Sequence, residues 1–124
     1  MTIISFFESD YNFSAKLAKV CDSQSNKLFF LSGSEFLEDY LDKNNNSIII
    51  IDIDDYENSL NDLIKGIRKY VDFPIYGLKT KMNIKMQKYA TEIGFDIVIT
   101  KSNFLHNIKT IKKQILNASR ISKN

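Results

Sequence analysis

Apolar positions along the chain follow two periodicities in turn. Short runs of β-branched and aromatic residues, typical of strands, are expected at 3–7, 27–31, 47–52, 74–78 and 95–100. Each is followed by apolar residues at helical spacing, and one such helix is expected over 34–43. The other four carry Phe13, Leu17 and Val20; Leu60, Leu63, Ile64 and Ile67; Met86, Ala90 and Ile93; and Leu105, Ile108, Ile111 and Ile115. Five strand–helix units predict an α/β fold with a parallel sheet covered on both faces.

The third strand segment, SIIIIDIDD, runs four isoleucines directly into carboxylates. An exposed antiparallel strand would alternate apolar and polar residues, so this run predicts a fully buried strand that ends at Asp52. In open parallel sheets, ligands bind beyond the carboxyl ends of the strands. Asp52 and its neighbours are therefore either site residues or ordinary loop residues that end the strand.

Composition narrows the class of protein. The chain has 124 residues, 44% of them hydrophobic and 26% charged, which is typical of one ordinary globular domain spanning 1–124. No apolar run approaches the roughly 20 residues of a membrane span. A net charge of +2 is too small to indicate nucleic-acid binding. A single cysteine, Cys21, fits a reducing compartment, so a cytoplasmic location is expected.

Catalytic motifs of common enzyme classes are missing from the sequence. No Walker loop or GxGxxG follows the first strand segment, so a nucleotide would lack a phosphate cradle. His106 is the only histidine, which argues against a histidine-dependent triad or a histidine-rich metal cluster. We therefore expect that the protein is not an enzyme.

Acids and lysines follow four of the predicted strands. They are Glu8, Ser9 and Asp10 after the first, Asp52 and Asp54 at the third, Lys79 and Thr80 at the fourth, and Lys101 after the fifth. These side chains meet on one rim if the strand order brings the strand ends together.

In order and spacing, the whole chain resembles a response-regulator receiver domain of two-component signalling. The resemblance implies a flavodoxin-like, doubly wound sheet of five strands in the order 2-1-3-4-5, in a three-layer α/β/α arrangement. It places Asp52 at the phosphoacceptor and Lys101 at the lysine that contacts the phosphate. It also implies that the acidic pair of the family is represented by Glu8 and Ser9.

Several motif positions depart from the family pattern. Ser9 replaces the second acid, and Lys79 stands where a Thr or Ser is usual, unless Thr80 takes that role by a slip of one residue. Ser102 replaces the usual proline after the lysine, and Val98 stands at the aromatic switch position. These changes predict a degenerate receiver.

The family site binds Mg²⁺, a hard ion that prefers oxygen ligands. The candidate ligands here are Glu8, Asp10, Asp52 and Asp54, and we expect at most weak binding because Ser9 is neutral. Lys79 either pairs with Asp52 or extends into solvent. In the first case Glu8 and Asp52 balance Lys79 and Lys101, and the site is neutral without a divalent ion.

Two functions follow from the resemblance. In the first, the protein is an atypical pseudo-receiver that acts through protein–protein interaction. In the second, it is a conventional receiver that takes phosphate on Asp52 from a histidine kinase or a phosphotransfer protein. Both imply a protein partner, which is one of these donors or a downstream effector, and both leave a homodimer open.

Overall fold

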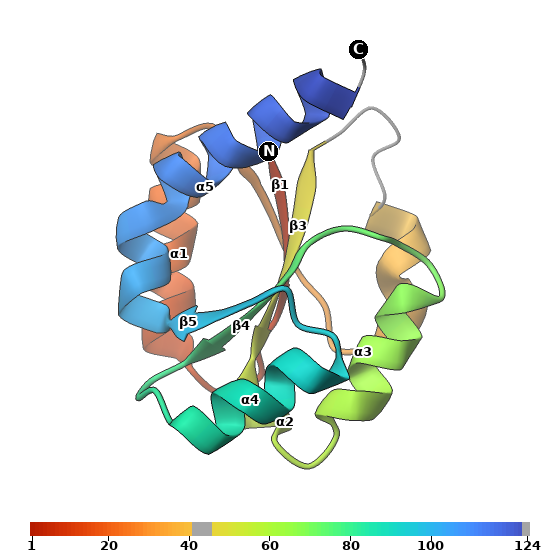
Figure 1. Cartoon of the computed structure of the whole chain (residues 1–124). Coiled ribbons are helices and arrows are strands. Elements are labelled where there is room, and N and C mark those ends of the chain that lie inside the picture. Colours follow the sequence, from red (N-terminus) through yellow and green to blue (C-terminus); the bar gives the residue numbers. More distant parts are fainter. Residues whose placement is uncertain (41–45, 123–124) are drawn as a thin grey trace.

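The computed structural model describes residues 1–40 and 46–122, with side chains up to residue 117. The strands are β1 (Thr2–Phe6), β2 (Lys27–Phe30), β3 (Ser47–Asp52), β4 (Ile75–Lys79) and β5 (Ile97–Thr100). The helices are α1 (Tyr11–Ser23), the 3₁₀ helix η1 (Ser34–Tyr40), α2 (Ile53–Tyr56), α3 (Leu60–Arg68), α4 (Ile84–Ile93) and α5 (Lys101–Ser122). Figure 1 shows their arrangement.

All five strands are parallel and lie in the order β2-β1-β3-β4-β5. This confirms the predicted doubly wound sheet. The register pairs Phe6 with Ile51, and Asp52 with Leu78. The carboxyl ends of β1, β3 and β4 therefore lie at one edge of the sheet.

The isoleucines of β3 divide between the two faces of the sheet because side chains alternate along a strand. Ile48 and Ile50 pack in a core with residues of α1 and α5, and Ile49 and Ile51 pack in a second core with η1, α3 and α4. The helices lie in the same two groups on the two sides of the sheet in Figure 1. A continuous apolar run thus fits a strand covered on both sides.

Two local predictions differ from the structure. The segment predicted as a helix over 34–43 forms the 3₁₀ helix η1, and its residues 41–43 lie outside the described part. Only Leu37 of η1 is buried, so little apolar packing supports a regular α-helix there. The short helix α2 was not predicted. It begins directly after β3 because Asp52 caps it: Asp52 Oδ1 accepts a hydrogen bond from the Asp54 backbone N–H at 3.0 Å.

No helix in the described ranges combines the length and apolarity needed to cross a lipid bilayer.

Arg68 at the end of α3 and Asp96 just before β5 form hydrogen bonds at the start of β4. Asp96 Oδ2 accepts hydrogen bonds from the Ile75 backbone N–H at 2.7 Å and from Arg68 Nη2 at 3.0 Å. Arg68 Nη1 also donates to the Phe73 carbonyl at 2.7 Å. Ile75 itself is fully buried. The Asp96 carboxylate thus satisfies a backbone donor at a position closed to water.

Replacing Asp96 by alanine should lower the free energy of unfolding by about 1–3 kcal/mol, because the Ile75 N–H loses its acceptor. Urea unfolding followed by circular dichroism measures this change. Asp72→Ala is the matched control. Asp72 pairs with the same arginine, but at 3.8 Å and fully exposed, so its loss should change stability by less than about 0.5 kcal/mol. Equal effects of the two substitutions would contradict this explanation.

Candidate functional site

Lys101 lies at the centre of a cluster of carboxylates. Its Nζ is 2.8 Å from Asp10 Oδ2, 2.9 Å from Asp52 Oδ2 and 3.5 Å from Asp54 Oδ2. The side chains of Lys101 and Asp52 are 10% and 1% exposed. Lys101, the first residue of α5, therefore connects this helix to Asp10 after β1, to Asp52 at the end of β3 and to Asp54 in α2.

Local backbone structure positions each of these side chains. Asp10 caps α1, where its Oδ1 accepts a hydrogen bond from the Phe13 backbone N–H at 3.0 Å. Its other oxygen remains for Lys101. Lys101 is the first residue of α5, and its Nζ lies 5.8 Å from the centre of the Phe7 ring, close enough for a cation–π contact. Asp10 thus has two contacts, one with the helix that it caps and one with Lys101.

Burial and pairing act in opposite directions on the charged groups. Burial raises the pKa of Asp52 to about 6, although Lys101 lowers it. Burial also opposes the charge of Lys101, but hydrogen bonds to Asp10 and Asp52 outweigh it and raise the lysine pKa. The hydrogen bond from Lys101, with that from the Phe13 N–H, lowers the pKa of Asp10. At neutral pH the cluster holds ionised carboxylates around one ammonium.

Lys79 follows neither of the two alternatives that the sequence left open, a pair with Asp52 or extension into solvent. Its Nζ is 3.0 Å from Asp54 Oδ1, so it neither pairs with Asp52 nor extends freely into water. Thr80 holds the other oxygen of Asp54 through its backbone N–H at 3.1 Å and its hydroxyl at 3.0 Å. Burial alone would raise the pKa of Asp54, but these hydrogen bonds together lower it. The proposed Lys79–Asp52 pair is therefore wrong, because helix α2 brings Asp54 to Lys79.

Asp55 is a site residue to which the sequence analysis assigned no role. Its Oδ2 accepts hydrogen bonds from the backbone N–H groups of Glu8 at 2.8 Å and Ser9 at 3.1 Å, and its Oδ1 accepts one from the Ser9 hydroxyl. The pKa of Asp55 is lowered because these bonds outweigh the effect of burial. Asp55 thus fixes the loop after β1. The signal was its place three residues after Asp52, in the first turn of α2.

Three of the four candidate metal ligands are paired with a lysine within the protein. Oxygens of Asp10, Asp52 and Asp54 converge on Lys101 Nζ, and Ser9, at the expected ligand position, donates its hydroxyl to Asp55. In the described part of the chain, no three acid, histidine or cysteine side chains are placed to hold a metal ion. These carboxylates are thus paired with an internal ammonium, and Ser9 supplies no charged oxygen for Mg²⁺.

The predicted charge balance also needs correction. It counted Glu8 and Asp52 against the two lysines and omitted three acids that the structure brings to the rim. Asp10, Asp52, Asp54 and Asp55 carry four negative charges when ionised, and the two lysines carry two positive ones. The site is therefore internally paired, but it keeps an excess of negative charge.

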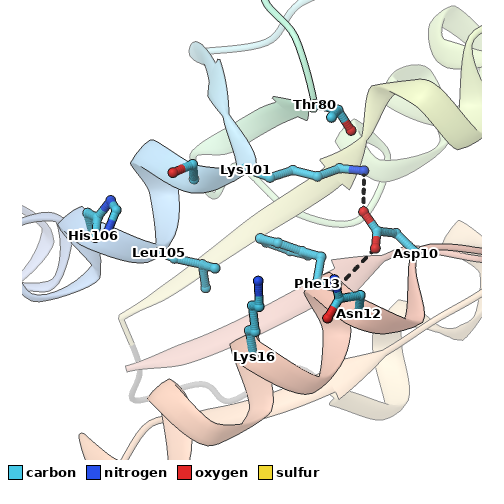
Figure 2. A pocket seen from close by; sticks show the side chains of 9 residues that line it. Asp10, Asn12, Phe13, Lys16, Thr80, Lys101, Leu105 and His106 are labelled. Carbon is cyan, nitrogen blue, oxygen red and sulfur yellow. Dashed lines mark hydrogen bonds and ion pairs between the residues drawn. The ribbon is translucent and has the colours of Figure 1, made fainter.

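An open cavity of about 380 Å³ lies beside the cluster, between α1 and the start of α5. Its lining residues come from three parts of the chain: Asp10, Asn12, Phe13, Lys16, Thr80, Lys101, Ser102, Leu105 and His106. Figure 2 shows Lys101 extended toward Asp10, with Thr80 above its ammonium in this view and His106 at the opposite side. Val98, at the predicted switch position, is buried in the core.

Comparisons with known proteins agree with the fold. Three solved structures are similar over most of their length: a response regulator of red-light signalling from R. palustris, a response regulator receiver protein from Pseudoalteromonas atlantica and a response regulator from Hahella chejuensis. Their sequence identities are 18%, 16% and 20%, with TM-scores of 0.65, 0.64 and 0.69. The matches cover 89%, 94% and 94% of this chain and 90%, 98% and 96% of the other chains.

No protein-family model matches the sequence, and no curated protein matches it. The similarity to the three solved structures shows that the chain has the fold of response-regulator receiver domains, as the resemblance implied.

Proposed function

We propose that this protein is an atypical receiver, which signals by binding protein partners without phosphorylation of Asp52. The observation that carries the proposal is the position of Lys101 Nζ, within 3.5 Å of Asp10, Asp52 and Asp54. An internal cation lies where the carboxylate oxygens converge, so these carboxylates already have an ion-pair partner. The fold then serves as a docking platform.

Phosphorylation would meet three obstacles at this site. Asp52 is 1% exposed, and one of its oxygens caps α2 while the other pairs with Lys101. Ser9 supplies no carboxylate for the divalent ion that balances phosphate charge in the family, and its hydroxyl is held by Asp55. Thr80, which could replace the missing hydroxyl at position 79, is committed to Asp54. Each obstacle favours a protein in which Asp52 is not phosphorylated, and the role that we propose is binding and not catalysis.

A conventional receiver remains the second candidate, and one observation favours it. Asp52 ends β3 with Lys101 at 2.9 Å, which is the pair that the family resemblance implies for a phosphoacceptor and its lysine. In this case a histidine kinase or a phosphotransfer protein would be the donor. For either function we place the protein in the cytoplasm, with a signalling protein or a second copy of the chain as partner.

Acetyl phosphate with Mg²⁺ separates the two candidates. We expect no stoichiometric gain of one phosphoryl mass in the intact protein by mass spectrometry, because Asp52 is buried and paired. Asp52→Asn is the control for the acceptor, and a receiver of known activity is the control for the reagent. A stoichiometric, Mg²⁺-dependent gain that Asp52→Asn abolishes would overturn the pseudo-receiver proposal and establish the conventional one.

A further inference from the structure

A second groove, of about 280 Å³, lies on the molecular surface next to Asp10, and we refer to it as the aromatic groove. Its lining residues come from the loop after β1, the first turn of α1 and the end of β2: Phe7, Glu8, Asp10, Tyr11, Ser14 and Phe30. None of them belongs to the wall of the larger cavity except Asp10. The aromatic groove is therefore a second surface feature, which shares only Asp10 with the larger cavity.

Two of the three aromatic rings in the groove are exposed. Tyr11 is 79% exposed and Phe30 is 46% exposed, whereas Phe7 is buried and stacks on Phe13 with 4.9 Å between ring centres. Tyr11 is the first residue of α1, and Phe30 is the last residue of β2, which is an edge strand. Two elements distant in sequence thus present aromatic surface to the same groove.

The charged side chains that line the groove are all acidic, and the nearby ammonium of Lys101, 5.8 Å from the Phe7 ring centre, is itself paired with Asp10. No lysine or arginine lines it, and its acids are Glu8 and Asp10. Asp10 is committed to Lys101 and the Phe13 N–H, whereas Glu8 is exposed and forms no ion pair within the described residues. Burial, the charge of Glu8 and a hydrogen bond to Glu8 raise the pKa of the Tyr56 hydroxyl, so Tyr56 is a neutral neighbour that does not offset the negative charge of Glu8. Asp55, which binds the Glu8 backbone, adds to the negative potential.

We propose that the aromatic groove binds an arginine side chain of a protein partner. A guanidinium group stacks on aromatic rings and pairs with a carboxylate, and its aliphatic stem suits an apolar wall. A hydrated metal ion does not match three aromatic rings, and a purely apolar side chain does not use the negative charge at Glu8. The inference rests on the proposed docking function and specifies the chemistry of its partner.

A capped tripeptide, acetyl-Gly-Arg-Gly-amide, tests the proposal in an NMR titration of the ¹⁵N-labelled full chain. The expected result is saturable amide shifts centred on Tyr11, Ser14 and Phe30. Replacing arginine by citrulline, which keeps the shape and removes the charge, should weaken binding severalfold. Tyr11→Ala and Glu8→Gln should each weaken the arginine peptide by roughly two- to fivefold, as expected for one exposed cation–π contact or one surface ion pair.

Tyr89→Ala is the matched control, because Tyr89 is a 42% exposed tyrosine on α4, away from the groove. Its substitution should leave the affinity unchanged. Equal binding of the arginine and citrulline peptides, or shifts that avoid the groove, would overturn the proposal. Because this titration needs no phosphate donor, its failure leaves the acetyl phosphate result unchanged. Conversely, phosphorylation of Asp52 would remove the pseudo-receiver proposal without changing where the arginine peptide binds.

Discussion

Replacing Lys101 by methionine should lower the free energy of unfolding at pH 7 by about 3–5 kcal/mol, the range for breaking one side of a buried ion pair. Methionine keeps most of the volume of the side chain, so the loss reports the charge. Without the ammonium, Asp52 remains 1% exposed with no cation on its Oδ2. Asp10 and Asp54 lose the same partner. Chemical denaturation in urea, followed by far-UV circular dichroism, measures the change.

Lys109→Met provides the control on the same helix. Lys109 is exposed, so its replacement should change stability by less than about 0.5 kcal/mol. The double variant Lys101→Met with Asp52→Asn should regain a large part of the loss, because the buried charge is removed with its partner. A loss below about 1 kcal/mol for Lys101→Met alone would show that the lysine is not the cation that stabilises the cluster.

Replacing Asp52 by asparagine should have the opposite effect and raise stability at pH 7, because it removes the buried negative charge while Lys101 keeps Asp10 as a partner at 2.8 Å. Folding raises the pKa of Asp52 from 3.8 to about 6, so the folded protein binds more protons than the unfolded chain between these values. The contribution of Asp52 to stability is therefore present below about pH 4 and is lost as the pH rises through about 6. A shift of roughly 2 units corresponds to about 3 kcal/mol as an upper value.

The pH dependence gives this prediction its test. Wild type and Asp52→Asn should have similar stability near pH 4, and the advantage of the variant should grow until about pH 6 and then level off. Urea unfolding at a series of pH values measures the difference between the two proteins. Subtracting the curves removes the contributions of Asp10, Asp54 and Asp55, whose lowered pKa values make stability fall at lower pH instead.

Asp54→Asn is the matched acid-to-amide control. Folding lowers the pKa of the Asp54 carboxyl group, so the charged form of Asp54 favours the folded state. Removal of this charge should therefore destabilise the protein at pH 7. The effect should stay within about 1 kcal/mol because the side chain is one-third exposed. Substitutions of Asp52 and Asp54 that change stability in the same direction would contradict the assignment of the buried, costly charge to Asp52.

The sheet could be predicted because its signals are local. Four consecutive isoleucines are all buried only if helices cover both faces of the sheet. The regular alternation of strands and helices then indicates parallel strands. Asp52 and Lys101 could be placed on one rim for the same reason. The partner of Lys79 could not be predicted, because it depends on α2, which exists through a cap made by Asp52 itself. Periodicity gives no signal for a helix of four residues, so the positions of Asp54 and Asp55 were found only in the structure.

The first residue of α5 binds acids that lie 91 and 49 positions earlier in the chain. A contact of this kind couples the loops after β1 and β3 to the last helix, so these three segments should open together in hydrogen exchange and not one by one. A partner that draws away either Asp10 or Lys101 would release all of them at once. The protein could in this way pass a binding event at one end of its sheet to its longest helix without any covalent change.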